Sequence, residues 1–66
     1  MAANAPGTSA LIAEVAEILV DRFGDDAEFR ARLVAYALHE SGDTEQAYAW
    51  MKVCWAIAEL RRRRSD

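Results

Sequence analysis

Residues 24–46 read GDDAEFRARLVAYALHESGDTEQ and contain two corners of the same design. At each corner a glycine can take the left-handed conformation that ends a helix, and the next aspartate can cap the following helix. A glutamate or glutamine three residues after each aspartate completes a capping box. The two sets are Gly24, Asp25 and Glu28 at the first corner, and Gly42, Asp43 and Gln46 at the second.

These corners predict an all-α fold with helices over residues 9–23, 26–41 and 44–63, the first capped by Thr8 or Ser9. Residues 1–8 are expected to form a flexible N-terminal arm. Residues 9–63 form a single three-helix domain in this interpretation, and residues 64–66 a frayed basic end. Such short corners make neighbouring helices reverse direction or cross steeply.

Apolar spacing predicts which faces of the first two helices point inward. The expected inner stripe of helix 9–23 contains Leu11, Ile12, Val15, Ile18, Leu19 and Phe23, opposite Glu14, Glu17 and Asp21. The expected inner stripe of helix 26–41 contains Phe29, Leu33, Val34, Tyr36, Ala37 and Leu38, with Glu28, Arg32 and His39 outward. Arg30 falls within the second stripe, where its stem can cover the core while its charge pairs nearby.

Helix 44–63 carries more apolar surface than a small domain needs for its own core. At about 100° per residue, one broad face collects Trp50, Val53, Cys54, Ile57 and Leu60. Tyr48, Met51 and Trp55 form a separate strip on the side that also holds Lys52. Because tyrosine, tryptophan and methionine are enriched at interface cores, we expect this strip to be a protein interface. The alternative is that this helix is central and covered on both sides.

The last predicted helix ends in four consecutive arginines, Arg61, Arg62, Arg63 and Arg64. At about 30 Å this helix is longer than the others, so we expect the arginines to extend past the bundle. Cations stabilise the negative end of a helix dipole, which accounts for the run without a ligand. The alternatives are contact with an acidic surface of a partner subunit, with nucleic acid, or with an anionic membrane surface.

Charge and composition restrict the function classes. Residues 1–60 carry ten acidic and four basic side chains, a net charge of −6, whereas residues 61–66 carry +3. Most of the chain would therefore repel nucleic acid. One cysteine, Cys54, and one histidine, His39, cannot build a four-ligand zinc site or an internal disulfide. We predict no catalytic, cofactor or metal site, and therefore no enzyme.

The sequence partly resembles a calcium-binding loop and a helix-turn-helix motif, but it lacks the features that each motif requires. The acids at residues 25–28 start a helix and lack the twelve-residue ligand spacing of a calcium loop. Helix 44–63 becomes apolar too early to act as the recognition helix of a helix-turn-helix protein, which needs polar side chains in its first turns.

The expected location is the bacterial cytoplasm. Residues 1–9 lack the basic start and apolar core of a signal peptide, and charge interrupts every apolar stretch before it could span a bilayer. The abundance of alanine and arginine, both with GC-rich codons, favours a GC-rich bacterial source.

The order of features over residues 14–61 resembles a family of short all-α bacterial proteins, found mainly in alphaproteobacteria and classed as a domain of unknown function. The matching features are Gly24-Asp25-Asp26-Ala27, Phe29, Gly42-Asp43, Trp50, Ile57 and Leu60. The resemblance implies an all-α fold and carries over no catalytic or binding residue. Tyr48, Cys54, Trp55 and the arginines are additional to the family pattern.

The sequence thus predicts a non-enzymatic protein-interaction module. It would be a homodimer or other homo-oligomer, or dock on a partner protein, through Tyr48, Met51 and Trp55. Small regulators, antitoxin-like or phage-encoded inhibitors and structural subunits all fit this description. The alternative function is a nucleic-acid or anionic-surface accessory protein that uses Arg61–Arg64.

Overall fold

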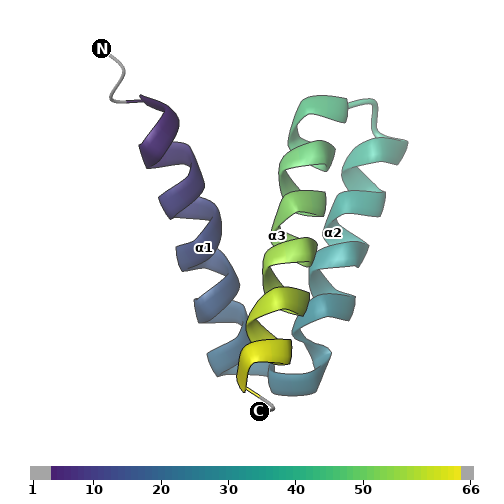
Figure 1. Ribbon diagram of the computed structural model, residues 1–66. Helices are drawn as coiled ribbons and strands as arrows, with labels where there is room; N and C mark the ends of the chain where they lie inside the picture. Colours follow the sequence, from purple (N-terminus) through teal and green to yellow (C-terminus); the bar gives the residue numbers. More distant parts are fainter. Residues whose placement is uncertain (1–3, 65–66) are drawn as a thin grey trace.

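The computed structural model describes residues 4–64, with side-chain environments described from Ala10 onward. The elements are α1 (Asn4–Phe23), a 3₁₀ turn η1 (Gly24–Asp26), α2 (Ala27–Glu40) and α3 (Thr44–Arg64) (Figure 1). The expected all-α class is confirmed, with no strand among the described residues. Because η1 joins α1 to α2 without a break, the chain forms two continuous helical segments, 4–40 and 44–64.

Helix α1 begins earlier than expected. Residues 4–8, predicted to belong to the flexible arm, are helical, and Thr8 and Ser9 lie inside α1 rather than at its cap. Pro6 is tolerated because the N–H groups of the first turn have no hydrogen-bond acceptor within the helix, so the missing N–H of proline breaks no bond. Arg64, expected to fray, is the last residue of α3. The rest of the expected arm, residues 1–3, and residues 65–66 lie outside the described part of the chain.

The second corner follows the prediction. Gly42 has φ of +92°, the left-handed conformation expected of it. The N–H of Asp43 donates to the carbonyl of Leu38 over 2.9 Å, and that of Gly42 donates to His39 over 3.1 Å. These are the two hydrogen bonds of a Schellman motif. The Asp43 carboxylate then accepts from the N–H of Gln46 over 3.2 Å, so Asp43 caps α3 as predicted. The expected capping box is formed only in this half, because the Asp43 N–H donates to Leu38 and not to the Gln46 side chain.

At the first corner only the glycine behaves as predicted, and the residues after it do not form the expected cap. Gly24 is left-handed, with φ of +55°. Asp25 does not cap α2, because η1 intervenes, and Asp26 precedes α2 without a side-chain capping bond. The expected Asp25–Glu28 capping box is therefore wrong: Glu28 instead accepts a hydrogen bond from Arg32 over 3.0 Å.

Helix α3 lies between the other two and packs against both. Figure 1 shows α2 and α3 side by side and antiparallel, whereas α1 diverges from α3 toward its N-terminal end. The Cα atoms extend over 34 × 33 × 16 Å, so the molecule is flat. A flat arrangement of helices exposes much of the surface that a rounder bundle would bury.

The core consists mainly of small side chains. Helix α2 turns an alanine toward α3 at every fourth residue, and α3 contributes the larger side chains. The buried residues are Ala16, Ala27, Ala31, Ala35, Ala47, Val53, Cys54 and Ile57. Ile57 is the largest side chain that is fully buried among the described residues. The hydrophobic stabilisation is correspondingly small, because it scales with the apolar area removed from water.

The predicted inner stripes of the first two helices are wrong in part. On α1, Ile12, Val15 and Leu19 are half-buried against the core, but Leu11, Ile18 and Phe23 are exposed. On α2, Leu38 is half-buried and the rest of the expected stripe is exposed: Phe29, Leu33, Val34, Tyr36 and Ala37. Arg30, expected to lay its stem on the core, is exposed, with its guanidinium 4.4 Å from the centre of the Phe23 ring.

The physical reason for the error on α2 is that both of its faces are apolar. Ala27, Ala31 and Ala35 lie on one face, and the large side chains of Phe29, Leu33 and Tyr36 lie on the other. The small face permits a close approach of the α2 and α3 backbones, and the structure places it inward. Apolar spacing cannot distinguish the two faces, because both repeat every three to four residues.

Candidate interaction surface on helix α3

The α3 strip, which consists of Tyr48, Met51 and Trp55, faces outward from α3. Tyr48 and Trp55 are 58% and 57% exposed, and Met51 is 38% exposed. The two aromatic rings meet edge to face, with centroids 6.4 Å apart and planes at 85°. The Lys52 ammonium lies 4.8 Å from the centre of the Tyr48 ring. These contacts favour this arrangement of the aromatic side chains before any partner binds.

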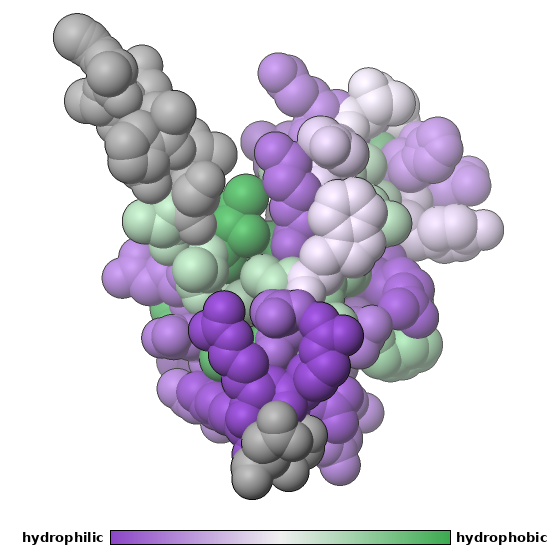
Figure 2. Space-filling model, in the orientation of Figure 1, coloured by the Kyte–Doolittle hydropathy of each residue, from purple (hydrophilic) through white to green (hydrophobic). Residues whose placement is uncertain are grey.

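An open hollow of about 360 Å³ adjoins the α3 strip, between α2 and α3. Its walls are mainly apolar, with the polar ends of Arg32 and His39 among them. The lining residues are Arg32, Ala35, Tyr36, His39, Thr44, Ala47, Tyr48 and Met51. Figure 2 shows near-white side chains of intermediate hydropathy over α2 and α3 on this side of the molecule. The strip therefore continues onto α2.

Tyr36 is the residue at this surface that sequence reasoning missed. It is 68% exposed and belongs to α2, although its spacing placed it in the expected core. The signal that could have identified it is the alanine series at residues 27, 31 and 35, which offers α3 a second, smaller face.

The core face predicted for α3 is mostly buried in the structure. Val53, Cys54 and Ile57 are buried, and Trp50 and Leu60 are half-buried. The exposure predicted for Tyr48 and Trp55 is confirmed as well. The two sets lie on different sides of α3, since Trp50 and Trp55 are about 140° apart around the helix.

The arginine run is engaged with acids of the same chain. The Arg61 guanidinium donates to Asp25 over 2.9 Å, and that of Arg64 donates to Asp21 over 3.4 Å. Arg62 and Arg63 both pair with Glu59 on α3 itself. The expectation that these arginines extend past the other helices is wrong for Arg61 and Arg64, because both reach the end of α1 and its corner. Figure 1 shows the end of α3 beside that corner.

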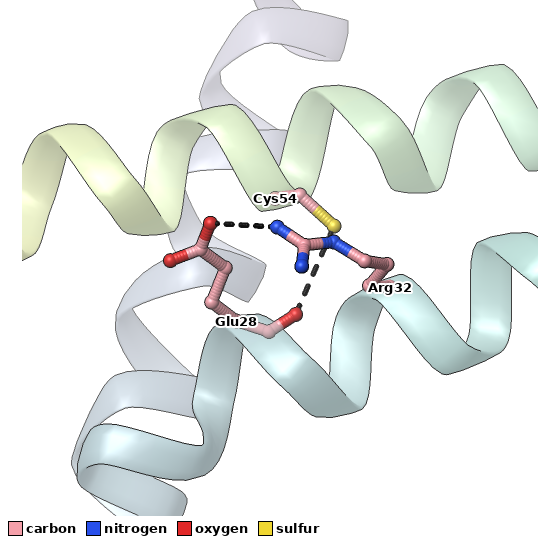
Figure 3. A network of polar contacts seen from close by, with 3 residues as sticks. All are labelled: Glu28, Arg32 and Cys54. Atoms are coloured by element: carbon pink, nitrogen blue, oxygen red, sulfur yellow. Dashed lines mark hydrogen bonds and ion pairs between the residues drawn. The ribbon is translucent and has the colours of Figure 1, made fainter.

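Cys54 lies buried where α3 crosses the first turns of α2. Its Sγ is 4.0 Å from the Glu28 carbonyl oxygen, and the Glu28 carboxylate binds Arg32 (Figure 3). Burial raises the pKa of the Cys54 thiol, and the nearby Arg32 charge opposes that shift in part. The thiol is therefore held in its protonated, weakly nucleophilic form. His39 instead borders the hollow between α2 and α3.

Residues 4–64 contain no group of three or more His, Cys, Asp or Glu side chains that could hold a metal ion. None of the helices in that range combines the length and apolar character needed to cross a membrane.

Comparison with known proteins gives no match: no protein-family model, curated protein or solved structure is significantly similar to this chain. The resemblance to a bacterial family of unknown function therefore remains a prediction from residues 14–61. The α3 strip and its surroundings are the basis for any functional conclusion.

Proposed function

We propose that this protein is a non-enzymatic interaction module, a three-helix domain that self-associates or docks on a partner protein through α3. The observation that carries the proposal is the exposure of Trp55, at 57%, on a helix whose other side supplies the core. We further propose that the protein acts in the bacterial cytoplasm. The support for a bacterial source is the abundance of alanine and arginine in the sequence.

The chemistry of the α3 strip supports this proposal. Large aromatic side chains supply most of the binding energy at protein interfaces when they become fully desolvated. Tyr48 and Trp55 already hold each other edge to face, so little side-chain freedom is lost when they bind. The adjoining hollow supplies an apolar recess that a side chain of a partner can fill.

The alternative, a nucleic-acid or anionic-surface accessory protein using Arg61–Arg64, has less support. Binding to phosphates requires cations that can release counterions from the nucleic acid. Here Arg61 and Arg64 already face Asp25 and Asp21, and the preceding residues carry a net charge of −6. We therefore keep the protein–protein function as the proposal.

The test compares Trp55→Ala with Phe29→Ala, a matched control because Phe29 is 58% exposed on α2. Sedimentation over a range of concentrations measures association, and circular dichroism measures unfolding. We expect Trp55→Ala to shift concentration-dependent association at least tenfold while the unfolding midpoint stays close to that of Phe29→Ala. An unchanged association constant with a large loss of stability would instead make Trp55 a core residue. If purified protein shows no such association, a photo-crosslinking residue at position 55, compared with position 29, tests docking on another protein.

A further inference from the structure

A second apolar surface lies on another side of α3, between α1 and α2. Two open hollows there both border Trp50, and together they are named the trough. The larger hollow, of about 320 Å³, is lined mainly by Leu19, Phe23, Leu33 and Val34, with Arg30 as its charged residue. The smaller, of about 160 Å³, is lined by Leu11, Ile12 and Val15 of α1, facing Trp50 and Val53. Figure 2 shows strongly hydrophobic side chains in the recess between α1 and α3.

The trough exists because α1 and α2 meet little beyond their shared corner. With α1 diverging from α3 (Figure 1), three helices leave room where a fourth would complete a bundle. The side chains that line this room are those that apolar spacing assigned to a core. Trp50, on its floor, remains half-buried.

Helix α1 carries an apolar stripe that its own chain covers only in part. Leu11, Val15 and Ile18 recur at the spacing of one helix face. Val15 is half-buried, but Leu11 and Ile18 are 60% and 50% exposed. Glu14 borders the other side of this stripe. Helix α1 therefore packs on α3 with one face and leaves an apolar edge uncovered, beside a trough that lacks a helix.

We propose that the trough binds α1 of a second copy, antiparallel to the first α1, in a two-fold symmetric dimer. The contact is isologous, because each copy supplies both a trough and the helix that fills the other. Charge supports this occupant: Arg30 is the charged residue lining the trough, and the incoming α1 brings Glu14 beside its apolar stripe.

The apolar side chains of the trough are themselves left uncovered. Leu33, Phe23 and Val34 are 51%, 38% and 38% exposed. A contiguous apolar surface of this kind marks an interaction site, because covering it removes apolar area from water. The contact is separate from the α3 strip, which remains exposed for the function proposed above.

The experiment compares Leu11→Glu with Trp55→Glu, two substitutions of side chains with similar exposure on different surfaces. Light scattering after size exclusion gives the mass of each, against 7.4 kDa for one chain. We expect a dimer for the wild-type chain and for Trp55→Glu, and a helical monomer for Leu11→Glu. A wild-type monomer, a dimer that survives Leu11→Glu, or a dimer lost with Trp55→Glu would each overturn the inference.

A second measurement applies if Leu11→Glu fails to fold. A single cysteine replaces Val15, near the middle of α1, in a Cys54→Ala background, and oxidation should cross-link most of the protein as a dimer. Cysteine at Tyr48 in the same background is the control and should cross-link much less. The reverse order would overturn the inference. If the dimer forms through the trough, the α3 strip is left to dock on another protein, so Trp55 variants keep the dimer. The proposed function fails separately, if a photo-crosslinking residue at position 55 captures no more protein than one at position 29.

Discussion

Arg61 and Asp25, thirty-six residues apart, form a hydrogen-bonded ion pair of 2.9 Å that joins the end of α3 to the corner after α1. Arg64 forms a second ion pair between the same two regions, with Asp21 of α1 at 3.4 Å. The cationic end of α3 thus lies beside the acidic end of α1, which places opposite charges together and suits the α3 dipole. The arginine run therefore contributes to the placement of α1 against α3.

The Arg61–Asp25 pair should contribute modestly to stability. The Asp25 side chain is 97% exposed, so solvent screens the attraction, and we expect a coupling free energy of up to about 1 kcal/mol. A double-mutant cycle with Arg61→Ala and Asp25→Ala, followed by urea unfolding, measures it. The coupling should shrink in high salt. A coupling that is independent of salt would show that the arginine stem, not its charge, makes the contact.

Substitutions on the two faces of α2 should differ in how much they lower the free energy of unfolding. Ala31 is buried against α3, so Ala31→Leu overfills the contact and should cost about 1–3 kcal/mol. Phe29 is 58% exposed, so Phe29→Ala should cost less than about 1 kcal/mol. If Phe29 were in the core, as its spacing predicts, its truncation would cost about 3–5 kcal/mol. Denaturant unfolding of both variants therefore decides which face of α2 packs on α3.

The Cys54 thiol should react slowly in the folded protein. Because burial blocks access and raises the pKa of Cys54, we expect iodoacetamide to label it at least tenfold faster in urea than in buffer. The sign for stability follows from the same shift. As pH rises through the ordinary thiol pKa, the unfolded chain ionises before the folded one, so stability falls. Mass spectrometry follows the labelling, and equal rates in both conditions would contradict the buried position.

Much of the local structure follows from the sequence. Gly42 and Asp43 predict the end of one helix and the cap of the next, because glycine alone adopts the left-handed turn without strain and aspartate satisfies a free N–H. Gly24 predicts the first corner for the same reason, although the 3₁₀ turn after it replaces the expected cap. These are interactions between near neighbours in the chain, so residue type and spacing are enough to predict them.

The candidate surface on α3 could also be predicted, since Tyr48 and Trp55 lie away from the side that holds Val53 and Ile57. The sequence left two alternatives, an exposed strip or a central helix covered on both sides. In the structure α3 is central, but Tyr48 and Trp55 remain exposed. The contribution of Tyr36 to the same surface could not be predicted, because it depends on how α2 is turned.

The sequence by itself determined the helical stretches, the glycine at each corner and the core face of α3, because each of these rests on local hydrogen bonds or on one clear contrast between faces. Only the tertiary structure decided which face of α2 packs on α3 and how far α1 diverges. Both faces of α2 are apolar, so burial alone does not select between them. The selection depends on side-chain size: alanines let the α2 and α3 backbones approach, and that approach leaves Phe29, Leu33 and Tyr36 exposed.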